Sequence, residues 1–346
     1  MSQMPISAAY TAPDSTEIPL LDVRHLTKHF PVGSFIKTRY VHAVEDVSFT
    51  VENRQVVALV GESGSGKSTT IRLIARLISA TGGEIFFRGS NVLKTEQGQA
   101  SLSYRREVQM IFQDPFSSLN AVHTIGHHIA RPLIVHKLAH DRKHLQVLVH
   151  ELLSVVGLDP AQEIARRYPH QLSGGQRQRV AIARALAVDP KLILADEPIS
   201  MLDVSIRMGI LNLIAQLKEE RDIAYLYVTH DLASARYIGD KIMVMYAGHM
   251  VEGGDCEEIM GNPAHPYTQL LLSAVPDPHA GLRTQKEIGA RGEVPSLIDP
   301  LPGCPFAARC TKGMDICRRV MPGPTHVAPD HWVRCHLFGP GSDKFA

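Results

Sequence analysis

Long apolar runs are missing from this chain, and so is an excess of charge of either sign. The 346 residues include 36 Lys and Arg against 35 Asp and Glu, a net charge of +1. This balance gives no electrostatic preference for nucleic acid or an anionic membrane. No apolar stretch reaches the roughly 18–20 residues that cross a bilayer, and residues 1–17 lack the basic and apolar blocks of a signal peptide. We therefore expect a cytoplasmic protein with a disordered lead-in over residues 1–18, whose membrane contacts run through a partner.

Cysteine is scarce and unevenly placed. Cys256 stands alone, whereas the other four lie within 32 residues: Cys304, Cys310, Cys317 and Cys335. In a reducing cytosol such a group indicates a metal or iron–sulfur site rather than disulfides. Four thiolates hold either Zn²⁺ or a [4Fe–4S] cluster, and the gaps of 5, 6 and 17 residues are wider than those of structural zinc sites, which favours a cluster. Zinc and free thiols remain alternatives, as do His331 or His336 as substitute ligands.

Short apolar runs alternate with helical periodicity along the middle of the chain. Runs typical of buried strands cover residues 56–60, 192–195, 224–228 and 241–246. One helix face is predicted by Ile71, Ile74, Ala75 and Ile78, with Arg72 and Arg76 turned away; another is predicted by Ile206, Ile210, Leu213, Ile214 and Leu217. Residues 120–170 predict a helical insertion, and the prolines and glycines of 276–303 a linker or irregular arm. The alternation predicts an α/β core with a mainly parallel sheet.

A glycine-rich loop follows the first apolar run and predicts a nucleotide site. It consists of Gly61, Glu62, Ser63, Gly64, Ser65, Gly66, Lys67, Ser68 and Thr69. Backbone N–H groups of such a loop surround phosphates, helped by the dipole of the following helix. Lys67 then supplies a positive charge to the β- and γ-phosphates, and the Ser68 hydroxyl binds Mg²⁺.

Two carboxylates end the second apolar run. Asp196 is the candidate to hold Mg²⁺, and Glu197 is the candidate general base that polarises the attacking water. A positioned base of this kind typically contributes about 10²–10⁴ to the rate.

Residues 172–176 read Leu-Ser-Gly-Gly-Gln, and this segment resembles the signature of the ABC ATPases. With the phosphate loop it makes roughly residues 19–275 similar to the ATP-binding subunit of an ABC transporter. The resemblance implies further site residues: Phe30, or alternatively Tyr40 beyond a long intervening loop, stacking on adenine; Gln113 touching Mg²⁺; Ser173, Gly174, Gly175 and Gln176 facing the γ-phosphate of a partner subunit; Asp203 in the D-loop; and His230 as the switch histidine. Met201 and Ile199 depart from the usual Ala and Thr, and Asn53-Arg54-Gln55 from the usual Gly-Glu turn.

The C-terminal part resembles one branch of that family. Residues 262–268, Asn-Pro-Ala-His-Pro-Tyr-Thr, followed by three leucines, look like the segment that closes the ATPase domain in oligopeptide and dipeptide importers. The long stretch from Phe30 to Tyr40 looks like the second of the two ATPases in such importers. The resemblance also implies a [4Fe–4S] cluster on the four C-terminal cysteines.

The implied protein is a translocase subunit that binds and hydrolyses ATP with Mg²⁺ to drive import of di- or oligopeptides. Its expected partners are a second ABC ATPase subunit in a heterodimer, two membrane permease subunits and an extracytoplasmic solute-binding protein. It would lie on the inner face of the cell membrane. The alternatives are a soluble ABC ATPase of DNA repair or translation, which would carry a long coiled-coil insertion or two ATPase halves, and a simple P-loop kinase.

The implied fold has a P-loop ABC ATPase core with a mainly parallel sheet, an antiparallel β subdomain and a helical subdomain. The ATPase domain covers 19–275, with the helical subdomain at about 115–180. A small, irregular cysteine-rich extension covers 276–346.

Overall fold

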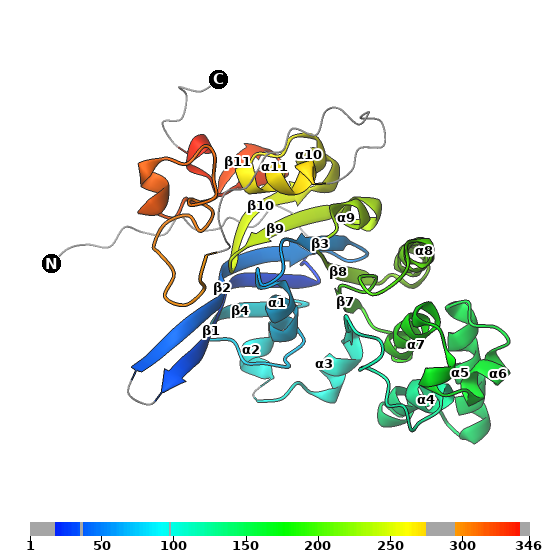
Figure 1. The fold of residues 1–346 in the computed structure, drawn as a ribbon. Helices are drawn as coiled ribbons and strands as arrows, with labels where there is room; N and C mark the ends of the chain where they lie inside the picture. The colour runs from blue at the N-terminus through cyan, green and yellow to red at the C-terminus, as the bar shows by residue number, and fades with distance from the viewer. Residues whose placement is uncertain (1–17, 35–36, 97, 275–294, 340–346) are drawn as a thin grey trace, which may run out of the picture.

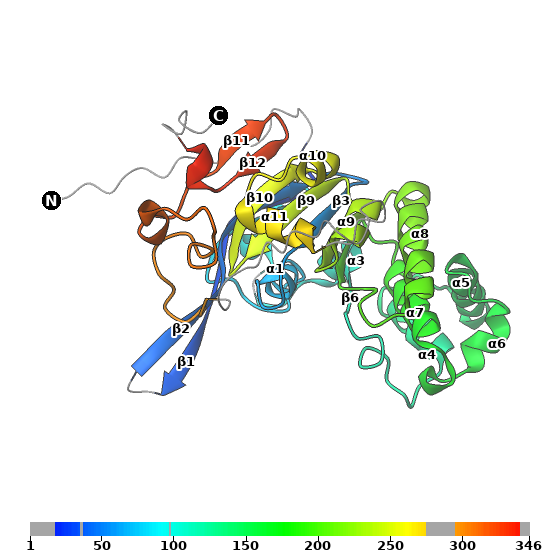
Figure 2. The same cartoon turned by 45° about the horizontal axis from the view of Figure 1, so that its top comes forward.

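The structure, a computed structural model, describes residues 18–34, 37–96, 98–274 and 295–339. Residues 1–17 of the predicted lead-in and residues 276–294 of the predicted linker lie outside these ranges. Figure 1 and Figure 2 show two sheets beside a separate group of helices, with the C-terminal strands at the far edge of the larger sheet.

Eight strands form the larger sheet, in the order β11-β12-β10-β9-β3-β8-β7-β6. Five neighbouring strands run parallel: β9 (Lys241–Tyr246), β3 (Val56–Val60), β8 (Ala224–Thr229), β7 (Leu192–Asp196) and β6 (Val108–Ile111). Three antiparallel strands extend it: β10 (His249–Asp255), β12 (His331–Val333) and β11 (Thr325–Ala328). The larger sheet is therefore mainly parallel, as predicted.

The smaller sheet is antiparallel, in the order β2-β1-β4-β5. Its strands are β1 (Leu21–Ser34), β2 (Lys37–Val51), β4 (Gly82–Phe87) and β5 (Ser90–Asn91). This sheet confirms the predicted antiparallel β subdomain.

Helices cover both sheets and form the separate group. The helices of the first half are α1 (Lys67–Ile74), α2 (Val92–Thr95), α3 (Leu102–Glu107), α4 (Ile125–Val135), α5 (Arg142–Val155) and α6 (Ala161–Arg166). Those of the second half are α7 (Gly174–Leu186), α8 (Val204–Arg221), α9 (Leu232–Ile238), α10 (Cys256–Gly261) and α11 (Pro266–Ser273). Short 3-10 turns are η1 (Pro169–Gln171), η2 (Asp315–Arg318) and η3 (His336–Phe338). Helices α4–α7 gather away from the sheets in both views. Among the helices that the structure describes, none combines the length and hydropathy that a bilayer crossing needs.

Two hydrophobic cores lie on opposite faces of the larger sheet. Val56, Ala58 and Val60 of β3 belong to the core that includes α4–α9, whereas Val57 and Leu59 belong to the core with the smaller sheet and α1. Successive side chains of a strand point to opposite faces, and a parallel strand covered on both faces is apolar throughout. This explains why the sequence of β3 contains no polar alternation.

The structure corrects three details of the sequence interpretation. Helix α1 ends at Ile74, and Arg76 takes a left-handed conformation with φ 57°, so Ile78 packs on the core from outside the helix. Residues 30–34 and 37–40, expected in a long loop, instead pair as parts of β1 and β2, with Phe30 opposite Val41. The C-terminal extension is only partly irregular, because β11 and β12 join the larger sheet.

Candidate functional site

Four neighbouring parallel strands each end at a predicted site residue. In the strand order β3-β8-β7-β6, the glycine-rich loop follows β3, His230 follows β8, Glu197 follows β7 and Gln113 lies just beyond β6. Parallel strands present their carboxyl ends at one edge, where α/β sheets bind ligands. The topology therefore gathers residues that lie far apart in the sequence.

The glycine-rich loop is shaped by two glycines that no other residue can replace without a shift. A Cβ on Gly61 would lie 2.1 Å from the Met245 carbonyl oxygen, and a Cβ on Gly66, with φ 106°, would lie 2.3 Å from the Ala43 carbonyl oxygen. Gly66 is the N-cap of α1, so the loop leads directly into a helix N-terminus. Loop N–H groups and helix dipole together favour an anion at this place.

Lys67 lies inside the loop. Its Nζ donates hydrogen bonds to the carbonyl oxygens of Gly61 at 2.8 Å and Glu62 at 2.9 Å. Burial lowers the pKa of Lys67, while Glu197, Asp196 and Glu62 act in the opposite direction. A buried ammonium group surrounded by these carboxylates is stabilised further by an anionic ligand such as a phosphate.

Ser68 and Asp196 form an oxygen pair at the start of α1. Ser68 Oγ donates to Asp196 Oδ1 at 2.8 Å. Burial raises the pKa of Asp196, against the opposing effects of the Ser68 hydrogen bond and Arg72. A hydroxyl and a buried carboxylate are ligands that Mg²⁺ accepts, and a divalent cation would favour the ionised form that burial disfavours.

Glu197 joins two other predicted residues. Gln113 Nε2 donates to Glu197 Oε2 at 3.1 Å, and His230 Nδ1 lies 3.1 Å from the same oxygen. Glu197 has φ 44°, a left-handed conformation that is uncommon for a residue with a side chain. Such strain clusters at functional sites. The structure thus brings Gln113, Glu197 and His230 together.

The signature-like segment lies elsewhere, at the start of α7. Ser173 is the N-cap of α7, and its Oγ accepts from Gln176 N while Gln176 Oε1 accepts from Ser173 N. This capping box fixes the helix N-terminus. Helix α7 lies with the group α4–α6, apart from α1, in Figure 1 and Figure 2. The segment and the glycine-rich loop are therefore separate surfaces of one chain.

Asp203 is the N-cap of α8, but its side chain makes no capping hydrogen bond there. Residues on both sides of Asp203 pack against the signature-like segment: a Cβ on Gly174 would lie 3.5 Å from Leu202, and one on Gly175 would lie 2.5 Å from Ile206 of α8. Met201 is exposed, which explains why a methionine fits where a smaller residue was expected.

Phe30 and Tyr40, the two residues considered for stacking on adenine, lie on opposite strands of the β1–β2 hairpin. Lys28 Nζ lies 4.9 Å from the centroid of the partly buried Phe30 ring, a cation–π contact. Tyr40 is 46% exposed, and its carbonyl oxygen accepts from Asp299 N in the C-terminal extension. Tyr40 is opposite Pro31 in the hairpin register. Both aromatic rings therefore belong to the same hairpin.

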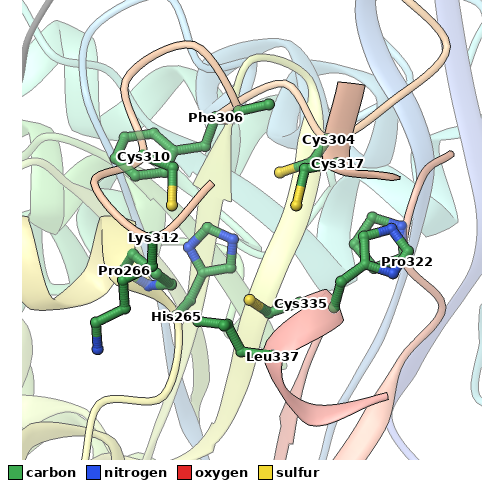
Figure 3. Close-up of a pocket in the computed structure, with 12 residues that line it drawn as sticks. His265, Pro266, Cys304, Phe306, Cys310, Lys312, Cys317, Pro322, Cys335 and Leu337 are labelled. Carbon is green, nitrogen blue, oxygen red and sulfur yellow. The ribbon is translucent and has the colours of Figure 1, made fainter. Parts of the chain in front are cut away.

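All four C-terminal cysteines line one cavity (Figure 3). Cys304 N donates to the Cys317 carbonyl oxygen at 2.7 Å, which ties two of the cysteine-bearing loops together. Burial raises the pKa of the Cys304 thiol to about 12 and that of Cys335 to about 11. A bound cation would favour the thiolate forms of Cys304 and Cys335, which burial disfavours.

The two alternative histidine ligands differ in position. His336 lines the cysteine cavity, and its Nε2 lies 2.9 Å from the Val320 carbonyl oxygen. His331 is buried elsewhere, with Nε2 2.6 Å from Glu252 Oε1. The structure thus brings His336 to the cysteines and leaves His331 outside the lining. His265, which the sequence interpretation did not single out, also lines the cavity.

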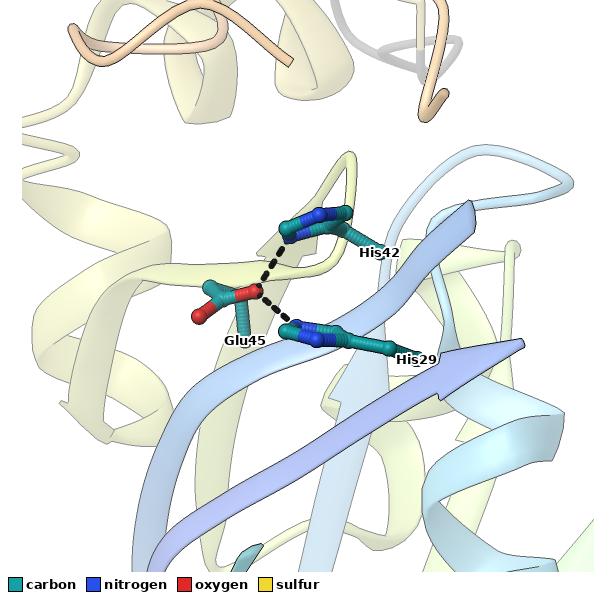
Figure 4. Close-up of side chains that lie close together, drawn as sticks. All are labelled: His29, His42 and Glu45. Carbon is teal, nitrogen blue, oxygen red and sulfur yellow. Dashed lines mark hydrogen bonds and ion pairs between the residues drawn. The ribbon is translucent and has the colours of Figure 1, made fainter. Parts of the chain in front are cut away.

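A second cluster lies within the β1–β2 hairpin, with His29 on β1 and His42 and Glu45 on β2 (Figure 4). Glu45 Oε2 lies 2.6 Å from His29 Nε2 and 2.8 Å from His42 Nδ1. Burial raises the pKa of Glu45, but the hydrogen bonds with His29 and His42 outweigh it and leave the pKa lowered. These atoms are closer than the separation of about 3.3 Å that tetrahedral zinc with 2.0 Å bonds would impose. The cluster is a hydrogen-bonded one that fixes the register of the hairpin.

Known proteins match both parts of the chain. The profile of a family described as "ABC transporter" matches residues 44–200, and that of "Oligopeptide/dipeptide transporter, C-terminal region" matches residues 251–317. The putative oligopeptide transport ATP-binding protein YkfD of Bacillus subtilis is 42% identical over 322 residues, covering 93% of this chain and 96% of the relative. The dipeptide transport ATP-binding protein DppF of Escherichia coli is 43% identical over 307 residues, covering 88% of this chain and 90% of the relative.

Solved structures match the fold. The dimeric post-hydrolysis ATP-binding cassette MJ0796, bound to ADP and Pi, superposes with a TM-score of 0.61 at 30% identity, covering 68% of this chain and 98% of that chain. CbiO1 from Clostridium perfringens superposes with a TM-score of 0.60 at 24% identity, covering 71% of this chain and 92% of that chain. This second likeness supports the fold alone.

Proposed function

The chain belongs to the ABC transporter family, in the branch of ATP-binding proteins of oligopeptide and dipeptide importers, and on this premise we propose that it powers the import of di- or oligopeptides. As an ABC ATPase it binds ATP and hydrolyses it. The observation that carries the assignment of the site is the convergence of Gln113 and His230 on one oxygen of Glu197.

Within this site Glu197 is the general base. Its carboxylate takes a proton from the attacking water while the γ-phosphate bond to ADP breaks. His230 orients Glu197 and contacts the γ-phosphate, and Lys67 stabilises the charge on the β- and γ-phosphates. The geometry supports these roles because Lys67 follows β3 and the other two follow neighbouring strands.

Mg²⁺ would be held by Ser68 and Asp196, with Gln113 completing the set. The 2.8 Å pair of Ser68 and Asp196 supplies two oxygen donors at the start of α1. When bound, the cation neutralises charge on the phosphate oxygens.

The other half of the site comes from a second subunit. The signature-like residues Ser173 to Gln176 lie on α7, apart from the glycine-rich loop of the same chain. We propose that they face the γ-phosphate held by a partner ATPase, so that two chains close around ATP and separate after hydrolysis. The partner is a related ATPase subunit in a heterodimer, with this chain as the second-ATPase type.

Phe30 is the proposed adenine platform, with Tyr40 as the alternative on the adjacent strand. Phe30 is partly buried and positioned by the hairpin, whereas Tyr40 is more exposed and lies next to the C-terminal extension. A positioned ring loses less conformational freedom on stacking.

For the four cysteines we propose a [4Fe–4S] cluster with a structural role. The donor set fits, because all four line the same cavity. Among the described residues, only His29, His42 and Glu45 form a group of three ligand atoms within 4.8 Å of one another, so no three sulfur atoms are that close. Tetrahedral zinc with 2.3 Å bonds would place sulfur atoms about 3.8 Å apart. The wider separation favours a cluster, whose thiolates bind different irons.

The permease contact is proposed at the segment after β6. Phe112, Phe116 and Val122 are exposed apolar side chains in or beside residues 113–120. Arg177, on α7 just after the signature-like residues, lies over the Phe116 ring at 4.2 Å. A helix of the permease that packs on Phe116 would therefore be linked through Arg177 to α7. The start of α7 is the segment proposed to face the partner's ATP. The subunit would lie on the inner face of the membrane, held by two permease subunits that receive peptides from a solute-binding protein.

The transport proposal is tested by co-expression with candidate permease subunits and a related ATPase subunit. Co-purification of this chain with two permeases, and peptide uptake that stops when Lys67 is replaced by Ala, are expected. Purification as part of a DNA or ribosome complex would contradict the proposal. Among the described residues between the loop and the signature, the longest helix is α5, Arg142–Val155, which gives no support to a coiled-coil repair ATPase.

A further inference from the structure

One side chain of the C-terminal extension reaches the phosphate loop. Arg309 donates from Nη1 to Glu62 Oε2 at 2.8 Å and from Nη2 to Glu62 Oε1 at 3.0 Å, across 247 residues of sequence. Arg309 Nη1 also donates to Tyr246 Oη at 3.2 Å. The Arg309 side chain is only 10% exposed. A bidentate, largely buried arginine–carboxylate pair has fixed geometry and is stronger than an exposed ion pair.

The backbone N–H, the carbonyl oxygen and the carboxylate of Glu62 all form hydrogen bonds. Its N–H donates to Tyr267 Oη at 2.8 Å, and its carbonyl oxygen accepts from Lys67 Nζ at 2.9 Å and from Ser65 N at 3.2 Å. Its carboxylate is held by Arg309. The position of Glu62 therefore determines where the carbonyl that Lys67 contacts lies, and with it the shape of the loop.

Arg309 is in turn fixed by the cysteine segment. It lies between Cys304 and Cys310, and Arg309 N donates to the Phe306 carbonyl oxygen at 3.0 Å. Phe306 is buried against Tyr246, with ring centroids 5.2 Å apart, and against Tyr267 at 5.4 Å. A five-residue loop between two thiols of one cavity thus carries both the aromatic anchor and the arginine.

We propose that Arg309 is a positioning residue through which the state of the four-cysteine segment sets the affinity of the phosphate loop for ATP. This inference rests on the proposed nucleotide site. When the thiols are held together, the loop presents Arg309 to Glu62 and the phosphate loop keeps its binding shape. When they are released, Arg309 moves away, and Glu62 becomes an unpaired carboxylate beside the triphosphate, which weakens binding by charge repulsion and by loss of loop order.

The test measures ATP binding to the purified full chain by calorimetry. Arg309→Gln should raise the Kd for ATP about tenfold, and Arg309→Lys, which keeps the charge but loses the bidentate geometry, should raise it a few-fold. The matched control is Arg236→Gln, because Arg236 makes an equally bidentate but exposed pair with Glu257. That variant should leave the Kd within twofold.

Coupling to the cysteines is tested by a double-mutant cycle. Cys310→Ser should weaken ATP binding in the wild-type background and have little further effect in the Arg309→Gln background.

In the assembled transporter, Arg309→Gln should raise the KM for ATP and leave kcat at saturating ATP within twofold. A purely structural role would not give this split. Circular dichroism checks that the variants are folded, and Arg309→Lys serves in place of Arg309→Gln if the glutamine variant is not.

Two results would overturn the inference: a folded Arg309 variant with unchanged ATP affinity, or an equal effect of Cys310→Ser in both backgrounds. Failure of the wild-type chain to bind ATP would instead refute the proposed nucleotide site.

Discussion

His230 Nδ1 lies 3.1 Å from Glu197 Oε2, although 33 residues separate them in the chain. They meet because β7 and β8 are adjacent and parallel, so that the residues after each strand lie at the same edge. In the mechanism proposed above, His230 contacts the γ-phosphate and aligns Glu197 at the same time, which would couple catalysis to the presence of the triphosphate.

Replacing Glu197 by Gln should abolish turnover without abolishing ATP binding. Gln keeps the hydrogen bonds with Gln113 and His230 within reach but cannot take a proton from water, so the ATPase rate should fall by about 10²–10⁴. ATP should then accumulate in a closed dimer, detected by gel filtration with radiolabelled ATP. Undiminished hydrolysis in the assembled complex would remove Glu197 as the base.

Phe30→Ala and Tyr40→Ala distinguish the two adenine platforms. Loss of aromatic stacking on a base costs about 1–3 kcal/mol, so Phe30→Ala should raise the Kd for ATP at least fivefold. Tyr40→Ala should change it less than twofold. The reverse order of effects, measured by the same calorimetric titration, would assign the stacking to Tyr40.

Protein purified without oxygen should be brown and contain about four irons per chain. Each single Cys→Ser variant at Cys304, Cys310, Cys317 or Cys335 should lower the iron content and the Tm. Cys256→Ser is the matched control, because Cys256 is buried in the main core and does not line the cysteine cavity. Stoichiometric zinc with no absorbance near 400 nm (a region where iron–sulfur clusters absorb) would instead identify a zinc site.

Stability should fall as the pH decreases from about 6.5 towards 4, in part because of His249. Burial lowers the pKa of His249 to about 4, although Glu45 and Asp46 oppose this shift. In the unfolded chain a histidine titrates at about 6.5, so within this window the unfolded state binds a proton that folded His249 does not. The stability that His249 contributes is therefore fully present above about pH 6.5, and it is lost as the pH falls towards about 4.

The wild-type free energy of unfolding should drop between pH 7 and pH 5 by about 1–2 kcal/mol more than that of His249→Gln. Urea titrations of both proteins at the two pH values measure the difference. Equal drops would show that His249 does not contribute.

The parallel core and the positions of the site residues follow from the sequence because local signals specify them. The run Val56–Val60 is apolar at every position, and its loop is recognisable from glycine spacing alone. Glu197 and His230 each follow such a run, so the rule that parallel strands end at one edge predicts that they converge.

Long-range contacts do not follow from the sequence in this way. Nothing in the local pattern around Arg309 indicates that it reaches Glu62, because the pair depends on how the extension packs against Tyr246 and Tyr267. The strand His331–Val333 is only three residues long and acquires its conformation by pairing with β10. Short, edge-paired strands have little periodicity to recognise.

The most direct test of the composite site is the turnover number of this chain as a function of subunit concentration, with and without the related ATPase subunit. If the partner supplies the signature residues, turnover per chain approaches zero at high dilution and rises to a plateau as the partner is added, and Ser173→Arg in the partner-facing segment blocks the site of the other subunit. Full, concentration-independent hydrolysis by a chain that remains monomeric would contradict the account.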